Sequence, residues 1–386
     1  MAGFVERGTV PGLVTLVSRR GDVRVDAIGT LSVDGTRPVG RDSIFRISSM
    51  TKPVTAVAAM ILVEECALRL DDPVAGLLPE LGDRRVLAHV DGPLDDTVPA
   101  DRPITVRDLL TFTMGFGMIM AEPGSTPLLA AIDDLALSQG PPNPQLAAPP
   151  DQWIGALGSL PLAHQPGERW MYNTGSDVLG VLVARVAGQP FDQFLRERIF
   201  DPLGMGDTGF FVPADRSGRL ATAYWTDPAT GALGLYDEPV GGQWSTPPAF
   251  PSGAAGLVST VDDYVSFGQM LLDKGRFQGG RILSRASVEL MTTDQLTPAQ
   301  KSGSGIVPGF FEHHGWGFGM SVVTRRDGVA GSVGTFGWDG GMGTSWFDDP
   351  AEDLVVLLMT QAAWASPSPP PVCLDLWTSV YQAIDD

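Results

Sequence analysis

Runs of strand-forming residues lie near both ends of this 386-residue chain and predict a sheet that joins the two ends. Near the N-terminus, residues 12–18 and 23–29 are rich in apolar and β-branched side chains and flank a turn at 19–22, which predicts a hairpin. Near the C-terminus, three further strand-like runs cover residues 316–323, 343–347 and 354–360.

The middle of the chain, from about residue 80 to 250, has proline-rich loops and scattered helical segments. A cluster of prolines at 140–150 predicts an irregular surface loop. Helical patterns cover 106–110, 178–187, 261–272 and 374–383. We therefore expect one α/β domain formed by 1–80 together with 251–386, and an inserted, mostly helical domain with long loops formed by 81–250.

Charge and cysteine content limit the possible partners and compartments. The formal net charge of −19 argues against nucleic acid or an anionic membrane surface as a partner. No segment is long and apolar enough to predict a membrane span, and residues 1–10 lack the apolar core of a signal peptide. We expect Cys66, inside a buried helix, and Cys373 to be free, buried thiols. These features predict a cytoplasmic protein.

Ser49 and Lys52 stand three residues apart, just ahead of an almost wholly apolar stretch at 54–63 that predicts a buried helix. This spacing places both side chains on one face of the helix. Burial and the positive end of the helix dipole both favour a neutral amine. A neutral lysine beside a serine can act as the base for a nucleophile. The alternative is that Ser48 or Ser49 only caps the helix and that Lys52 extends into water.

Tyr172 is the candidate for returning a proton to the leaving atom. It lies in the sequence WMYNTGSDVLG (170–180), ahead of an amphipathic helix capped near Ser176 or Asp177. The alternative is a core aromatic whose hydroxyl is hydrogen-bonded.

An oxyanion that develops during acyl transfer needs N–H donors. The N–H of Ser49, at the start of its helix, is one candidate, and a residue in the glycine-rich segment 337–343 is the other. Dense glycine marks a place where a ligand or another backbone comes close, although a plain glycine-rich turn is the alternative. Each such donor can lower the barrier by roughly 3–4 kcal/mol.

Three motifs together give a family resemblance. Ser49-x-x-Lys52, the tyrosine segment 170–180 and GWDGGMGT (337–344) resemble the motifs of the serine β-lactamase and D,D-peptidase superfamily. Within it, the chain looks most like the carboxylesterases with a β-lactamase fold, of the family VIII type. The resemblance implies an α/β (α+β) fold with a central antiparallel sheet flanked by helices. It also implies an acyl-serine intermediate without metal or other cofactor, with Tyr172 as motif tyrosine and Gly341 at the oxyanion position.

Departures from the lactam-processing motifs point to a different substrate. Thr174 replaces an asparagine that contacts the substrate amide, and Trp338 replaces the lysine that attracts the lactam carboxylate. Asp339, which follows, would repel an anion. A neutral small-molecule ester is therefore the expected substrate. Trp338 is expected to line an acyl or alcohol pocket together with a run of apolar side chains: Met114, Phe116, Met118 and Met120. The alternative for this run is ordinary packing in the core.

Other chemistries have less support. The chain has no Gly-x-Ser-x-Gly nucleophile elbow, and its four histidines have no metal-ligand spacing. An amide or oligomer hydrolase, an acyltransferase and a weak β-lactamase remain as alternatives that use the same acyl-serine. A catalytically silent binding or sensor protein on the same fold remains as the alternative outside enzymes. Nothing in the sequence predicts the oligomeric state.

Overall fold

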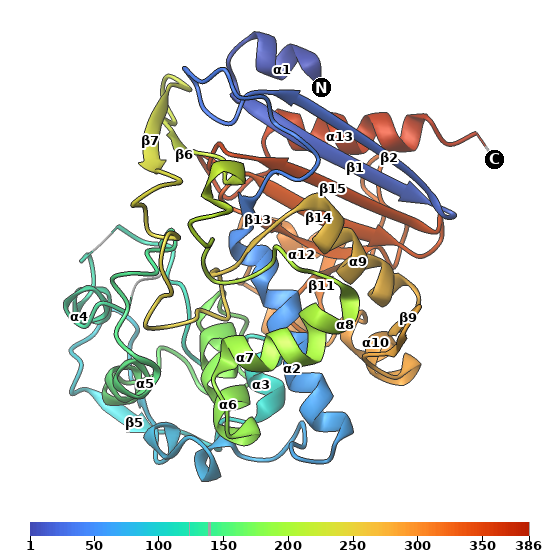
Figure 1. Ribbon diagram of the computed structural model, residues 1–386. Coiled ribbons are helices and arrows are strands. Elements are labelled where there is room, and N and C mark those ends of the chain that lie inside the picture. Colours follow the sequence, from blue (N-terminus) through green and yellow to red (C-terminus); the bar gives the residue numbers. More distant parts are fainter. Residues whose placement is uncertain (123, 138–139, 386) are drawn as a thin grey trace.

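The structure, a computed structural model, describes residues 1–122, 124–137 and 140–385. Strands from both ends of the chain form one seven-stranded sheet in which all neighbouring pairs are antiparallel (Figure 1). The predicted central sheet and the N-terminal hairpin are thereby confirmed. The order across the sheet is β11 (His314–Trp316), β12 (Ser321–Val323), β13 (Phe336–Gly340), β14 (Thr344–Asp349), β15 (Leu354–Thr360), β1 (Gly12–Arg19) and β2 (Asp22–Gly29).

The other described elements surround this sheet. The remaining strands form pairs: β3 (Phe45–Arg46) with β8 (Val258–Ser259), β4 (Arg85–Leu87) with β5 (Thr97–Pro99), β6 (Ala223–Thr226) with β7 (Leu233–Asp237), and β9 (Arg276–Phe277) with β10 (Gly280–Arg281). The α-helices are α1 (Ala2–Glu6), α2 (Thr51–Glu64), α3 (Val106–Leu110), α4 (Pro127–Asp134), α5 (Pro150–Ser159), α6 (Thr174–Ala187), α7 (Phe191–Leu195), α8 (Asp201–Leu203), α9 (Val261–Leu272), α10 (Arg285–Met291), α11 (Pro298–Lys301), α12 (Phe310–His313) and α13 (Pro371–Gln382). Four 3₁₀ segments, η1 (Ser48–Met50), η2 (Val74–Gly76), η3 (Pro79–Leu81) and η5 (Ser217–Arg219), and the π-helix η4 (Arg196–Phe200) complete the order.

The two faces of the large sheet are covered by different helices. Leu354 and Val356 of β15 lie in one hydrophobic cluster with residues of α1 and α13. Val355 and Leu357 point the other way, into the main core, where α9 packs against β14 and β15. This alternation follows from the period of two along a strand. Both faces of β15 are therefore buried.

Helix α2 runs through the centre of the molecule (Figure 1) and packs against α6. It is apolar around its circumference, and residues Thr51 to Leu62 are all buried. Such a helix is stable because protein surrounds it. Among the described residues between 81 and 250, none joins the large sheet. A separate domain with boundaries at 81 and 250 stays a prediction.

In the large sheet, one strand was not predicted, and one predicted strand is divided. The glycine-rich segment after residue 335 forms β13, between β12 and β14. The run predicted at 316–323 forms two strands, β11 and β12, which turn at Gly319, where φ is 74°. A Cβ atom on Gly319 would lie 2.9 Å from the carbonyl oxygen of Lys52. The turn thus needs glycine both for its backbone angle and for its approach to α2.

The prediction of Cys66 as a buried residue inside a helix is wrong. Helix α2 ends at Glu64, and Cys66 has a φ of 59° with an exposed side chain. Its N–H donates to the carbonyl of Val63, and the next N–H, of Ala67, donates to Leu62. This left-handed residue closes the helix end, a position that glycine usually occupies. Cys373 is buried, and both cysteines are free.

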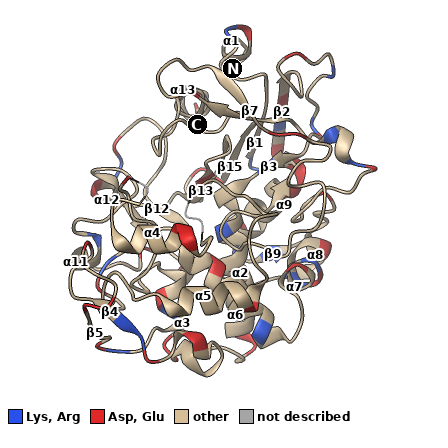
Figure 2. Cartoon of the chain, turned by 90° about the vertical axis from the view of Figure 1, so that its left-hand side faces the viewer, with Lys and Arg blue, Asp and Glu red and all other residues tan. Residues whose placement is uncertain are grey.

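Charged residues are interspersed over the elements that Figure 2 shows, with acidic and basic segments on the same helices. Within the part of the chain that the structure describes, no helix has the length and hydropathy of a membrane span.

Strand β13 passes so close to η1 that only glycine fits at Gly340. A Cβ there would lie 2.2 Å from the carbonyl oxygen of Ile47, whereas a Cβ on Gly341 would meet open space. We expect Gly340→Ala to lower the free energy of unfolding by about 1–3 kcal/mol, the usual cost of overpacking. Gly341→Ala, the matched control, should change it by less than about 0.5 kcal/mol. Urea denaturation measures both. Equal effects would contradict this account of β13.

Candidate active site

Ser49 lies in η1, immediately before α2, with its side chain half-buried on the wall of a cavity of about 1250 Å³. The preceding residue, Ser48, has a φ of 44°, which is uncommon for a residue other than glycine. Strain of this kind persists where the surrounding structure fixes it, and it is found most often at functional sites.

Lys52 is completely buried, so the alternative in which its amine extends into water does not hold. Its Nζ atom lies 2.8 Å from Ser49 Oγ and donates to the carbonyl oxygen of Ala254, also at 2.8 Å. Burial lowers the pKa of the amine to about 7, against a smaller opposing effect from the charge of Asp177. A large fraction of the molecules therefore carries a neutral amine at pH 7, which can accept the serine proton.

The segment 253–257 is held along one side of α2. Thr51 Oγ1 accepts from the N–H of Leu257, and Thr55 Oγ1 donates to the carbonyl of Gly253. Lys52, between them, donates to Ala254. These contacts fix the carbonyl of Ala254, which accepts a hydrogen bond from the Lys52 amine. The fixed carbonyl helps to orient the amine towards Ser49.

Asp177, which the sequence pattern indicates only as a helix cap, also belongs to the site. It lies in the first turn of α6, is buried, and accepts hydrogen bonds from Ser252 Oγ at 2.6 Å and from the N–H of Ala254 at 3.1 Å. Burial raises the pKa of this carboxyl, and the hydrogen bonds and Lys52 oppose that rise. Asp177 and Lys52 thus bind the N–H and the carbonyl of the same residue, Ala254, and their titrations influence each other. The only signal in the sequence is an acid five residues after Tyr172.

Tyr172 is buried among aromatic rings. It belongs to a cluster that also contains Phe112, Trp170, Leu296, Trp316 and Trp338. Its hydroxyl oxygen accepts a hydrogen bond from Trp338 Nε1 at 2.6 Å, and Lys52 Nζ lies 4.5 Å from its ring centroid. Burial raises the pKa of the phenol, while hydrogen bonding to Ser49 and Trp338 opposes the rise. The phenol is therefore protonated at neutral pH and lies beside both Ser49 and Lys52.

Two further backbone positions, at Asn173 and Gly341, frame this cluster. Asn173 follows Tyr172 with a φ of 84° and lines the cavity. Gly341, at the end of β13, also lines the cavity; its carbonyl accepts from the N–H of Trp364. The close approach of β13 to η1 at Gly340 brings this strand end beside the backbone of Ser49.

The expected pocket residues divide into two groups. Met118, Trp338 and Asp339 line the cavity. Met114 and Phe116 do not, because both are fully buried in the main core; for them the alternative, core packing, applies. Met120 is 60% exposed and lies outside this cavity.

Thr174 was also expected at the substrate, but it is buried in the first turn of α6 and does not line the cavity. Asn173, one residue earlier, occupies the lining instead. The left-handed backbone at Asn173 produces this difference, because it turns the chain into α6 directly after Tyr172. In the described ranges, no group of three or more His, Cys, Asp or Glu side chains is arranged to hold a metal ion.

The comparisons with known proteins agree with this geometry. The sequence profile of the Beta-lactamase family matches residues 1–368. The chain belongs to this family. Protein Rv1367c of Mycobacterium tuberculosis (strain ATCC 25618 / H37Rv) is 43% identical to it over 362 residues, which cover 92% of this chain and 87% of the relative. Esterase EstB of Burkholderia gladioli is 32% identical over 378 residues, 93% of this chain and 88% of EstB.

Solved structures give the same result. EstCE1, described as a hydrolase with promiscuous acyltransferase activity, aligns with a TM-score of 0.75 at 27% identity and covers 94% of this chain and 91% of its own. The predicted resemblance is confirmed: this is a member of the beta-lactamase family of serine hydrolases, with esterase relatives and a relative that also transfers acyl groups.

Proposed function

We propose that this beta-lactamase-family protein cleaves carboxylic esters of small molecules through an acyl-serine intermediate. The observation that carries the proposal is the contact of a buried amine with one hydroxyl: Lys52 Nζ lies 2.8 Å from Ser49 Oγ. A lysine with a pKa of about 7 is half-neutral at pH 7, and general bases work best when their pKa is near the working pH.

In the proposed acylation, Ser49 Oγ attacks the ester carbonyl carbon while its proton moves to Lys52. The oxyanion accepts hydrogen bonds from the N–H groups of Ser49 and Gly341. When the carbon–oxygen bond to the alcohol breaks, Tyr172 donates its phenolic proton to the departing alkoxide. The protonated Lys52 then restores that proton to Tyr172.

Trp338 has a defined part in this step. Its indole N–H donates to the Tyr172 oxygen, so it stabilises the phenolate that forms as the proton leaves. In deacylation the same groups act in reverse, and water replaces the alcohol. Because Lys52 and Tyr172 exchange one proton, the apparent pKa values belong to the pair.

An ester is favoured over a lactam for two reasons. Trp338 stands where lactam-processing enzymes have a lysine that attracts a carboxylate, and it presents a ring instead of a charge. Esterase EstB is also similar over most of its length. Acyl transfer to an alcohol is the second candidate, because EstCE1 is described with both activities and the same acyl-serine can react with either acceptor. A cytoplasmic location is part of this proposal.

A panel of p-nitrophenyl esters of increasing acyl length, with intact-mass detection of the acylated protein, tests the proposal. We expect turnover of at least part of the panel and a mass increase equal to the acyl group. Added alcohols that shift products from acid to ester would show acyl transfer. Faster cleavage of amides or of a cephalosporin would contradict the ester preference. Acylation without turnover would instead indicate a silent binding protein.

A further inference from the structure

The cavity does not end at Ser49; it extends past the edge of β13. Strand β12 pairs with β13 only at Phe336 and Gly337. From Trp338 onward the edge of β13 is not covered by β12. The same cavity contains Ser49 and Tyr172 on one side and residues of α13 on the other. We call the part under α13 the rear pocket, defined by Asp339, Phe347, Cys373, Leu374 and Trp377.

Asp339 faces the rear pocket because side chains alternate along β13. Trp338 points to Tyr172, so its neighbour points to the opposite face of the sheet. Asp339 is opposite Ser345 on β14. Phe347, two residues after Ser345, lies on the same face of the sheet and packs edge-to-face on Trp377 of α13. The charge of Asp339 also acts on the thiol of Cys373, whose pKa is raised first by burial and then by this charge.

One oxygen of the Asp339 carboxyl lacks a partner. Its Oδ1 atom is buried, and among the described residues it has no hydrogen-bond donor. Burial raises the pKa of the carboxyl to about 7, against a smaller opposing effect from hydrogen bonding with Ser345. A carboxylate oxygen without a donor is costly to bury, whereas a cation placed beside the carboxyl stabilises its ionised form.

The described lining of the cavity contains several acids and no permanently cationic side chain. Three acids line the cavity, Glu312, Asp327 and Asp339, and within the described lining there is no lysine or arginine. His314 also lines it, but burial lowers the pKa of that ring, so it is neutral. His313 lies 3.8 Å from Asp327 and can offset that acid when protonated.

Aromatic rings add to the attraction for a cation. Trp338, Trp364, Trp377 and Phe347 line the cavity on both sides of Asp339. The faces of such rings attract ammonium groups when water is excluded. A hydrophobic arm with a cationic end therefore matches this lining, and a carboxylate does not.

We propose that the rear pocket selects esters whose hydrophobic arm carries a cationic amine or quaternary ammonium group, which pairs with Asp339. This inference rests on the proposed esterase function. Asp339 is two residues from Gly341 along β13, roughly 7 Å. The arm therefore has to reach past the strand from the ester carbonyl.

Two ester series test the selection, one with the arm on the acyl side and one with the arm on the alcohol side. In each, the arm ends in trimethylammonium or in the neutral isostere tert-butyl. In at least one series we expect kcat/KM to favour the cationic ester by roughly ten- to a hundredfold, and Asp339→Asn to reduce that ratio to near one. Asp375→Asn, which removes an exposed carboxylate of α13 outside the cavity lining, should leave the ratio unchanged.

The outcomes separate this inference from the proposed function. If neutral esters are hydrolysed without a preference for the cation, or if the preference survives Asp339→Asn, selection by the rear pocket is contradicted and the esterase proposal is not. If no ester is cleaved, calorimetry with Ser49→Ala still decides: 4-phenylbutyl-trimethylammonium should bind, 4-phenylbutanoate should not, and Asp339→Asn should weaken the cation about tenfold or more. The inference is contradicted if the two probes bind equally well, or if the cationic probe binds equally well with and without the Asp339→Asn substitution.

Discussion

Ser49→Ala is expected to abolish hydrolysis of a short p-nitrophenyl ester and covalent labelling by a serine-directed phosphonate. The reason is that Ser49 Oγ lies within 2.8 Å of a buried amine, and the other groups of the site converge on this oxygen. Removing a nucleophile leaves only the small residual catalysis that binding and oxyanion donors supply. Intact-mass analysis before and after labelling measures the loss directly.

Ser48 offers a matched control for this variant. It is the adjacent serine, and its φ of 44° suits glycine, so Ser48→Gly removes a hydroxyl without adding strain. We expect Ser48→Gly to be labelled and Ser49→Ala not, with the circular dichroism of both unchanged. Labelling of Ser49→Ala would place the nucleophile elsewhere.

Tyr172→Phe is expected to lower kcat by about 10²–10⁴-fold, the contribution of a positioned acid–base group. The ring, which packs in the aromatic cluster with Trp316 and Trp338, stays in place, so the loss isolates the hydroxyl. Steady-state hydrolysis of an ester with a poor leaving group is the sensitive measurement, because such an alkoxide needs the proton most.

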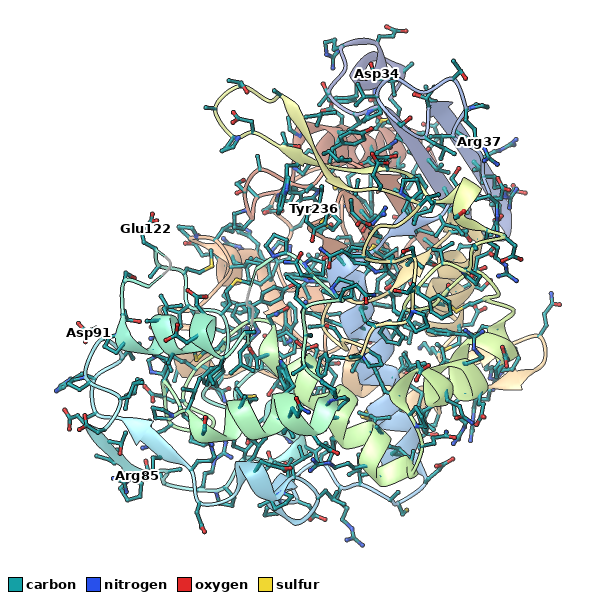
Figure 3. All side chains as sticks on the ribbon, turned by 60° about the vertical axis from the view of Figure 1, so that its left-hand side comes forward. Asp34, Arg37, Arg85, Asp91, Glu122 and Tyr236 are labelled. Atoms are coloured by element: carbon teal, nitrogen blue, oxygen red, sulfur yellow. The ribbon has the colours of Figure 1, made fainter. Side chains whose placement is uncertain are left out.

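Tyr236→Phe is the control for loss of a tyrosine hydroxyl. Tyr236 lies in the middle of the molecule in Figure 3, and its hydroxyl donates to the carbonyl of Pro142 rather than to the catalytic cluster. Its removal should change kcat by less than about threefold, as for a hydrogen bond of modest net energy. A near-normal rate for Tyr172→Phe would exclude this tyrosine from the mechanism.

Much of the fold could be predicted because local patterns agree with tertiary packing. The helices at Val106–Leu110 and Val261–Leu272 and the strand Leu354–Thr360 have the predicted bounds. Strand β13 could not be predicted, because glycine has low strand propensity and its place is set by neighbours far away in sequence. Gly340 is needed there because Ile47, almost 300 residues earlier, lies against it.

The site residues also divide into those that local sequence patterns predict and those that they do not. Ser49 and Lys52 are neighbours on one helix turn, so their spacing predicts their contact. Asp177 and Lys52 both bind Ala254, one at its N–H and the other at its carbonyl, and no local pattern encodes this contact between three distant segments. Met114 and Phe116 were expected at the substrate because apolar side chains line pockets and cores alike. The sequence pattern does not distinguish the two.

The pH dependence of phosphonate labelling at Ser49 tests the central claim, that Lys52 is a neutral base near pH 7. Because burial depresses the pKa of Lys52, the reactive neutral amine is lost as the pH falls below about 7. Labelling should therefore rise with pH and level off above a midpoint near 7. Asp339→Asn, which removes the other group with a pKa of about 7, should keep that midpoint. A rate that climbs steadily to pH 10, as with an ordinary lysine, would contradict the claim.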